Sequence, residues 1–349
     1  MRDGISRAII ATVSVTMVVA SGVWTSNGSS GTPATASASN GCASGPVTVG
    51  YVPKLGTDPY MVTVRNAAQA AAKEIGGKVV YTSPSDATGP AQIPFVDQLI
   101  VQHVGVIAIS GSDLHSTAPA LKKAMAAGIK VISFDSDVET DARTLFINQA
   151  STPLLGKLML DSMYKILHGK GDFAILSSTP TAVNQNAWIA AMKQRLATDS
   201  ALSKMHLVTV AYGQEKADVN AQQALALTQT YPNLKGIIVP AGIGLPAAAE
   251  ALSRSGALGR VKLTGLAPVT LIKKYILSGN VQDIWWNVSD LGYLSYYAAQ
   301  AVAECKITGT PGQSFKAGRL GSRTVGKDGQ VLLGPPDIVT PRNANSFAF

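Results

Sequence analysis

A repeated alternation of two kinds of segment constrains the fold of this chain most. From Val47 onward, short runs rich in β-branched residues alternate with longer Ala-rich segments that have a helical period. Val47–Val52 has the composition of a buried strand, and Val64–Ile75 spaces its apolar residues by three and four. Strands that alternate with helices favour parallel sheets with right-handed crossovers. We therefore predict an α/β fold made of doubly wound parallel sheets.

The alternation restarts after residue 150, so the chain divides into two halves of similar length. The first half adds the predicted strands 79–82, 106–110 and 131–134 and the predicted helices 93–102 and 118–127. The second half has the predicted strands 172–177, 206–211, 236–239 and 262–266 and the predicted helices 154–167, 188–196, 217–231 and 245–255. A further helix is predicted at 291–304, and the extended runs 331–333 and 338–339 should add to a lobe or cover it.

Two such halves predict two lobes. In doubly wound sheets, ligands bind outside the carboxyl ends of the strands. Where two lobes face each other at those ends they form a cleft between domains, which is a usual place for a small-molecule site. The length agrees with this division, because domains of about 100–200 residues make a chain of 349 residues about two domains.

The charge of the chain is a weak guide to its partners. The formal net charge is +8, but the basic residues are dispersed singly or in pairs such as Lys122-Lys123 and Lys273-Lys274. Without a basic stripe, the pattern is typical of a solvated surface, and we expect no nucleic-acid partner. With 46% hydrophobic and 14% charged residues, the chain can form a sizeable core.

The N-terminal segment predicts export. Arg2 and Arg7 precede the uncharged apolar run 8–20, which has the length of a signal-peptide core and is shorter than a bilayer span. We therefore predict a signal peptide over 1–20, with an uncleaved anchor as the alternative. The following stretch, 21–46, is rich in Ser, Gly, Thr and Ala and predicts a flexible tether. The folded part should lie outside the cytoplasm, in the periplasm or at the cell surface.

The chain has two cysteines, Cys42 and Cys305, and three interpretations of them remain open. A disulfide between them suits an exported protein. Cys42 could instead be lipidated, although Ser39-Asn40-Gly41 is a poor lipidation signal and lies far from the apolar run. The third interpretation is two unrelated free thiols.

No catalytic or metal-binding pattern stands out. The four histidines, His103, His115, His168 and His206, lie in unrelated segments without a ligand spacing. There is no GxSxG elbow or Walker A motif, and the glycines around Gly242 lack the third one of a phosphate-binding loop. We therefore expect no enzyme activity, no cofactor and no metal.

Polar and aromatic residues instead gather at the ends of the predicted strands. A sugar presents hydroxyls that donate and accept hydrogen bonds, together with apolar C–H faces. Carboxylates, amides and ammonium groups pair with the hydroxyls, and aromatic rings cover the faces. The candidate binding residues are Lys54, Tyr60, Asp135, Asp137, Asn184, Gln185, Trp188, Pro240, Gly242, Trp286 and Asn287.

Several of these segments carry a family resemblance that runs from Val47 to Phe349. The segments are Val52-Pro53-Lys54-Leu55, Phe134-Asp135-Ser136-Asp137, Phe146-Ile147-Asn148-Gln149, Asn184-Gln185-Asn186-Ala187-Trp188 and Leu245-Pro246-Ala247-Ala248-Ala249. They resemble the ribose-binding-like sugar receptors of ABC transporters, within the branch of rhamnose-binding and autoinducer-2-binding proteins. The resemblance implies a monomeric receptor that binds a sugar or polyol and delivers it to an ABC permease in the membrane.

The resemblance also implies a periplasmic binding protein fold of type I, with two lobes joined by a three-stranded hinge. Lobe one would comprise 47–147 plus 287–311, and lobe two 148–286 plus 312–349. The three crossings would fall near 146–149, 286–287 and 312–325. Cys42 and the end of the helix that precedes Cys305 would then lie on the same side, away from the cleft, which makes a disulfide sterically reasonable.

The implied ligand pattern matches only in part. Lys54, Asp135, Gln185 and Pro240 match the pattern of autoinducer-2 receptors, whereas Asn184 and Gly242 depart from it. The run from Trp286 to Tyr293 is closer to rhamnose-type members, and Ala267 lacks the aspartate of ribose-type relatives. A deoxy-sugar or a related polyol is therefore the expected ligand. Autoinducer-2 reception and sugar sensing for a membrane kinase are the alternatives.

Overall fold

The computed structural model describes residues 41–347. The predicted signal peptide and most of the predicted tether therefore lie outside the described residues. Within residues 41–347, none of the helices has both the length and the apolar character that a membrane span requires.

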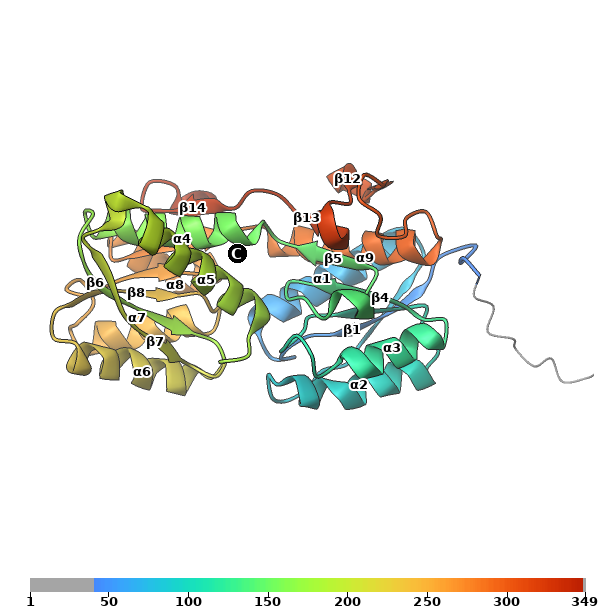
Figure 1. Ribbon diagram of the computed structural model, residues 1–349, viewed down its shortest axis with the longest axis horizontal. Coiled ribbons are helices and arrows are strands. Elements are labelled where there is room, and N and C mark those ends of the chain that lie inside the picture. The colour runs from blue at the N-terminus through green and yellow to red at the C-terminus, as the bar shows by residue number, and fades with distance from the viewer. Residues whose placement is uncertain (1–40, 348–349) are drawn as a thin grey trace, which may run out of the picture. The chain divides into compact units, whose positions relative to one another are not determined.

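Residues 41–347 contain two six-stranded sheets, each covered by helices on both faces, and these define the two lobes (Figure 1). In lobe one the strand order is β13-β5-β4-β3-β1-β2, and all neighbours are parallel. The strands are β1 (Thr48–Val52), β2 (Lys78–Tyr81), β3 (Val106–Ile109), β4 (Lys130–Phe134), β5 (Leu145–Asn148) and β13 (Gln330–Leu332). The helices of this lobe are α1 (Pro59–Glu74), α2 (Gly89–Val101), α3 (Ala118–Ala126) and α9 (Val288–Ala303).

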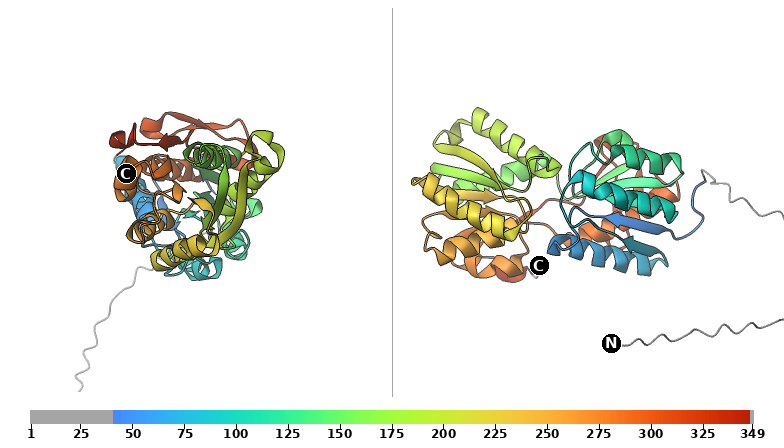
Figure 2. Two further views of the ribbon diagram at one scale, coloured as in Figure 1. Left: turned by 90° about the vertical axis from the view of Figure 1, so that its left-hand side faces the viewer. Right: turned by 90° about the horizontal axis from the view of Figure 1, so that it is seen from below.

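Lobe two repeats the same winding. Its order is β14-β10-β9-β8-β6-β7, in which only β14 runs antiparallel to its neighbour. The strands are β6 (Gly171–Ser177), β7 (Met205–Tyr212), β8 (Leu234–Val239), β9 (Lys262–Gly265), β10 (Val281–Trp285) and β14 (Asp337–Val339). The helices are α4 (Thr152–Ile166), α5 (Val183–Thr198), α6 (Ala217–Thr230), α7 (Gly244–Arg254) and α8 (Val269–Leu277). The predicted α/β fold with two doubly wound lobes is thus confirmed (Figure 2).

The chain crosses between the lobes three times. It leaves lobe one after β5, returns between β10 and α9, and leaves again between β13 and β14. The resemblance implies crossings near 146–149, 286–287 and 312–325, and in the structure they lie at 149–151, 286–287 and 333–336. The expected segment instead forms the hairpin of β11 (Ser314–Lys316) and β12 (Ser322–Thr324), next to α9. Of the stretch 312–349 that we assigned to lobe two, β13 therefore pairs within lobe one and only β14 joins the second sheet.

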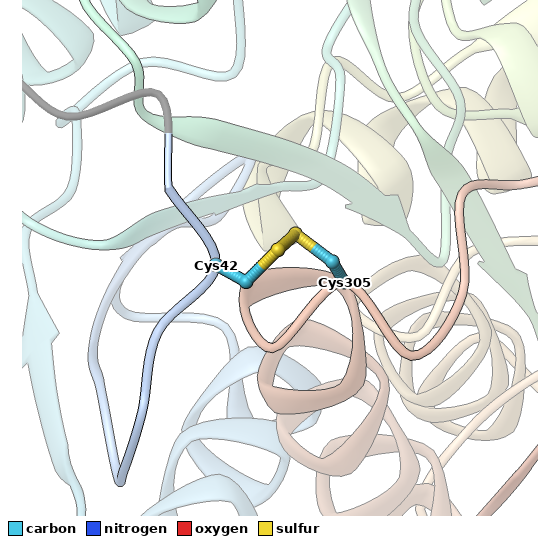
Figure 3. Close-up of a disulfide and its surroundings, with 2 residues drawn as sticks. All are labelled: Cys42 and Cys305. Atoms are coloured by element: carbon cyan, nitrogen blue, oxygen red, sulfur yellow. A yellow bond between two sulfur atoms is a disulfide. The ribbon is translucent and has the colours of Figure 1, made fainter.

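Cys42 and Cys305 form a disulfide at the end of α9, with 5.3 Å between their Cα atoms (Figure 3). Hydrogen bonds hold the same segment, because the Ala43 amide donates to the Ala303 carbonyl at 2.8 Å. The Val47 amide likewise donates to Gln300 Oε1 at 3.1 Å. Of the three open interpretations of the cysteines, the structure agrees with the disulfide, which leaves Cys42 no thiol to lipidate.

Candidate functional site

The carboxyl ends of the strands of both lobes face one shared hollow with a volume of about 60 Å³. Nine of the eleven candidate residues from the sequence line it, namely Lys54, Tyr60, Asp135, Asn184, Gln185, Trp188, Pro240, Gly242 and Trp286. The remaining lining residues are Asp58, Met61, Glu215, Leu266, Ala267, Pro268, Ile284 and Val288. The sequence therefore located most of this hollow, and the strand-end rule for doubly wound sheets explains why.

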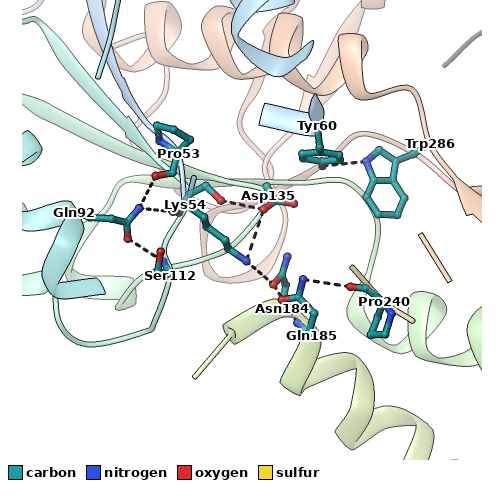
Figure 4. Close-up of polar contacts among 11 residues, drawn as sticks. Pro53, Lys54, Tyr60, Gln92, Ser112, Asp135, Asn184, Gln185, Pro240 and Trp286 are labelled. Carbon is teal, nitrogen blue, oxygen red and sulfur yellow. Dashed lines mark hydrogen bonds and ion pairs between the residues drawn. The ribbon is translucent and has the colours of Figure 1, made fainter. Parts of the chain in front are cut away.

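Lys54 makes a hydrogen bond that connects lobe one to lobe two. It follows β1 in lobe one, and its Nζ donates a hydrogen bond of 2.8 Å to Asn184 Oδ1, which begins α5 in lobe two (Figure 4). The same Nζ lies 4.0 Å from Asp135 Oδ2. All three side chains are buried. A buried charge is costly unless it is paired, so this contact couples the positions of the two lobes.

A buried glutamine holds the loop that carries Lys54. Gln92 Nε2 donates to the carbonyl of Pro53 at 3.0 Å and to that of Ser110 at 2.8 Å. Its Oε1 accepts from the Ser112 amide at 2.9 Å. One side chain of α2 thereby ties together the loops after β1 and β3, so that Lys54 stands on a fixed support. Gln92 was not predicted from the sequence, because a glutamine within a helix has no pattern of its own.

Asp135 is a buried carboxylate at the end of β4. Burial raises its pKa, while the nearby Lys54 ammonium and hydrogen bonds from Ser110 and Tyr60 work in the opposite direction. Ser110 Oγ donates to Asp135 Oδ2 at 2.9 Å. The backbone of Asp135 has φ of 60°, a left-handed conformation that is uncommon outside glycine and that is often found at functional sites. Asp135 is thus positioned to accept hydrogen bonds inside the hollow.

Lobe two contributes neutral polar groups. Gln185 Nε2 donates to the Pro240 carbonyl at 3.3 Å, and the Gln185 amide donates to Asn184 Oδ1 at 3.0 Å. Gln185 Oε1 is buried and has no hydrogen-bond partner. Because an unpaired buried acceptor costs roughly 1–3 kcal/mol, a donor group supplied by a ligand would be favourable at this atom.

Aromatic and aliphatic side chains form the rest of the wall. Trp286 Nε1 donates to the Tyr60 hydroxyl at 3.1 Å, and the two rings meet edge to face with centroids 6.2 Å apart. Trp188 is buried on the side of lobe two. These rings offer flat apolar surfaces of the kind that covers the C–H face of a sugar ring.

Two acidic side chains in the hollow were not found from the sequence. Asp58 belongs to lobe one and caps α1, where its Oδ1 accepts from the Tyr60 amide at 3.0 Å. Glu215 belongs to lobe two and follows β7. Burial and, second, the Glu215 carboxylate raise the pKa of Asp58 to about 7. The Asp-Pro pair at 58–59 is a helix-start signal that could have pointed to Asp58.

Two of the candidate residues lie outside the hollow. Asp137 pairs with the buried Arg143 guanidinium, whose Nε lies 2.5 Å from Asp137 Oδ1. The carboxylate is therefore already used inside lobe one, next to a separate pocket. Asn287 is exposed and caps α9, since its Oδ1 accepts from the Asp290 amide at 3.0 Å. Both residues therefore have local partners and do not line the hollow.

Ala267 lies in the wall at the end of β9, as its place in the sequence suggests. Its amide donates at 2.9 Å to Oδ1 of Asp283, which is fully buried on β10. Burial raises the pKa of Asp283 well above the usual range. The small Ala267 side chain leaves that part of the hollow apolar. Among residues 41–347, no group of three or more metal-ligand side chains comes together.

The wall of the hollow presents hydrogen-bond donors, acceptors and apolar surface of the kind that a small molecule with several hydroxyls would contact. A model of the periplasmic binding protein domain family matches residues 49–307. The chain belongs to this family. A curated relative, the D-ribose/D-allose-binding protein of Pseudomonas aeruginosa, is 26% identical over 243 residues, which cover 67% of this chain and 74% of the relative.

Solved structures of the same kind are similar over most of their length. An ABC transporter solute-binding protein from Clostridium phytofermentans with bound L-rhamnose is 34% identical, with a TM-score of 0.84 over 86% of this chain and 98% of that one. A sugar ABC transporter protein from Actinomyces odontolyticus is also 34% identical, with a TM-score of 0.70 over 86% and 97%. LsrB from Clostridium saccharobutylicum in complex with AI-2 has a TM-score of 0.80 over 87% and 100%, and at 23% identity this likeness concerns the fold.

Proposed function

We propose that the chain is an exported receptor that captures a small sugar in the hollow between its lobes and delivers it to an ABC importer. The observation that carries this proposal is the contact of Lys54 with Asn184, at 2.8 Å, inside a hollow to which both lobes contribute. A ligand held by both lobes binds the closed arrangement better than the open one. It therefore shifts the equilibrium toward closure, and the closed form is the one that docks on the permease.

The size of the hollow supports a hinge motion. Its volume is about 60 Å³, and one water needs at least about 10–15 Å³ of such space. The hollow accommodates a few waters, whereas a sugar ring with its hydroxyls is larger. We infer that the lobes separate to admit the ligand and close around it, with the hinge at the three crossings. Separation breaks the hydrogen bond between Lys54 and Asn184 and exposes both partners to the ligand.

The chemistry of the wall favours a deoxy-sugar such as rhamnose, or a related polyol. Lys54, Asp135, Asn184 and Gln185 provide both donors and acceptors for ring hydroxyls. The aromatic rings and the residues Leu266, Ala267 and Ile284 provide an apolar surface on which a hydroxyl would be left without a partner. A methyl group in place of a hydroxyl suits that side. The solved relative with 34% identity contains L-rhamnose, which agrees with this ligand class.

Autoinducer-2 is the second candidate, because Lys54, Asp135, Gln185 and Pro240 all lie in the hollow. At position 184 this chain has an amide where the pattern of autoinducer-2 receptors has a carboxylate. The amide removes a charged acceptor and adds a hydrogen-bond donor. Presentation of the bound sugar to a membrane kinase uses the same site and would differ only in the partner.

Isothermal titration calorimetry of the chain without residues 1–20 tests the proposal. The panel comprises deoxyhexoses, pentoses, hexitols and autoinducer-2, with sucrose as an oversized control. We expect one deoxyhexose or polyol to bind at a single site and to raise the unfolding temperature by mass action. If autoinducer-2 alone bound tightly, the ligand would be this signal molecule and not a sugar. If no member of the panel produced binding heat, the proposal would be refuted.

A further inference from the structure

Seven basic side chains surround one groove in lobe two, which we call the strand-start groove. It has a volume of about 710 Å³ and lies where β6, β7, β8 and β9 begin. This is the edge of the sheet opposite the hollow between the lobes. Its basic residues are His168, Lys170, Lys204, His206, Lys235, Arg260 and Lys262.

The register of the parallel sheet brings these residues together from distant parts of the sequence. Gly171 on β6 pairs with Met205 on β7, and Gly236 on β8 pairs with Lys262 on β9. The Gly171 amide also donates to the Lys204 carbonyl at 2.8 Å. A side chain at position 171 would approach the stem of Lys235 to 3.1 Å, so Lys235 lies directly beside the start of β6.

The charge of the groove is almost uncompensated. Asp172 is the one acidic residue in its lining, and it contacts His206 Nδ1 at 3.2 Å. Five lysine and arginine charges less one carboxylate leave +4 with both histidines neutral. Among the described residues, Lys170, Lys204, Lys235 and Arg260 form no ion pair.

Elsewhere among the described residues, some basic side chains have acidic partners and others, such as Lys73 and Lys193, form no ion pair. Lys123 pairs with Asp97 at 2.7 Å, and Lys157 pairs with Asp161 at 2.6 Å. Collecting like charges without counter-charges costs free energy, which a bound polyanion would offset. The strand-start groove differs in that several unpaired basic side chains lie around one hollow, which favours an anion there.

We propose that the strand-start groove binds a linear polyanion that carries closely spaced phosphate groups. Lysine and arginine side chains at several strand starts can contact successive phosphates along a groove. A lipid bilayer fits less well, because peripheral attachment combines charge with inserted apolar side chains. None of the large exposed apolar side chains of residues 41–347, such as Val101 and Leu271, lines this groove. Because the groove and the sugar cleft lie at opposite edges of the sheet, both can be occupied at once.

The test uses inorganic polyphosphate as the probe, with the mature chain in low and high salt. The triple variant Lys204→Gln, Lys235→Gln, Arg260→Gln removes three unpaired charges from the groove. We expect its affinity for polyphosphate to fall roughly 100-fold, because each of the three basic groups near an anionic surface contributes about a factor of five. Wild-type affinity should fall steeply with added salt.

The matched control is Lys73→Gln, Lys193→Gln, Arg342→Gln, which changes the net charge equally at exposed positions that form no ion pair among the described residues. We expect it to lose less than about threefold in affinity, since these positions lie away from the groove. Equal losses in both variants, no binding of polyphosphate by the wild type, or binding only to phosphatidylglycerol vesicles would each overturn the proposal. Sugar affinity and the unfolding temperature are measured in parallel. Unchanged sugar binding in the groove variant keeps this result separate from the proposed receptor function.

Discussion

The two lobes have the same strand winding but present different chemistry to the cleft. Lobe one contributes charged groups, Lys54, Asp58 and Asp135, whereas lobe two contributes mainly amides and a carbonyl, at Asn184, Gln185 and Pro240. Glu215 is the exception in lobe two. The difference teaches that the sheet sets where a site lies, while the loops at the strand ends set what it binds. Under the proposed function, the charged lobe would anchor the ligand hydroxyls and the amide lobe would adapt to their pattern.

Loss of the main acceptor in lobe one should have the largest effect on binding. In Asp135→Ala the buried Lys54 ammonium loses its nearby carboxylate, and truncating one partner of a buried pair costs about 2–5 kcal/mol. We expect sugar affinity to fall at least about 30-fold, while the fold is retained. Calorimetry and circular dichroism together check this outcome.

Asp137→Asn is the control for that variant, because it alters a carboxylate two residues away that serves Arg143. It should lower the unfolding temperature and change sugar affinity by less than about threefold, since the site is untouched. Equal losses of affinity in the two variants would show that Asp135 is not the main acceptor for the sugar.

Reduction of the disulfide should lower the free energy of unfolding and loosen lobe one more than lobe two. The bridge closes a loop with a sequence separation of 263 and holds the first described residues to α9 of lobe one. Its loss in Cys42→Ala, Cys305→Ala should cost about 2–5 kcal/mol, mostly by freeing the unfolded chain. Hydrogen exchange followed by mass spectrometry should show faster exchange in α1 and α9 than in α6 and α7. The wild type with a reductant should match the double variant, and uniform loosening of both lobes would contradict the assignment.

The carboxylates of Asp58 and Glu215 predict a dependence on pH. The pKa of Asp58 is raised from 3.8 to about 7 in the folded chain, so the folded state binds more protons than the unfolded state between these values. Stability from the neutral acid is therefore lost as pH rises through about 7. In Asp58→Asn the side chain stays neutral and still caps the helix. Between pH 5 and 8 we expect the wild type to lose about 2–3 kcal/mol more than the variant in urea unfolding. Parallel pH profiles would show that the pKa of Asp58 is not raised in the folded chain.

The smallest predicted effect concerns selectivity in lobe two. Asn184→Asp places a carboxylate against Lys54 and removes an amide donor. We expect deoxy-sugar affinity to fall about tenfold and any affinity for autoinducer-2 to rise, as calorimetry would measure. Asn186→Asp adds the same charge on α5 outside the hollow, where Asn186 contacts the Pro180 carbonyl, and should leave both affinities unchanged.

Much of this organisation was accessible from the sequence, because buried strands and amphipathic helices have strong periodicities. The helix α8 and the hairpin β11–β12 were missed, although the equally short α3 and β13 were predicted, so length alone does not explain these omissions. The third crossing was placed by the family resemblance and not by periodicity, and it lies at 333–336.

Individual side chains were harder to predict. Asp135 and Asp137 look equivalent in the sequence, yet the left-handed backbone at Asp135 faces it to the hollow while Arg143 holds Asp137 elsewhere. The basic residues of the strand-start groove look dispersed, because each comes from the beginning of a different strand. Only strand pairing, which is a property of the folded chain, brings them together.

The disulfide also determines how force would pass through the molecule. If an anchor before residue 41 pulled on the chain, Cys42 would carry the load first, and the bond would transfer it to the end of α9 and not to β1. Lobe one would then stay fixed, and lobe two would rotate relative to it about the three crossings. A pull on the N-terminal end would then load the disulfide without separating the strands of the sheet that carries Lys54.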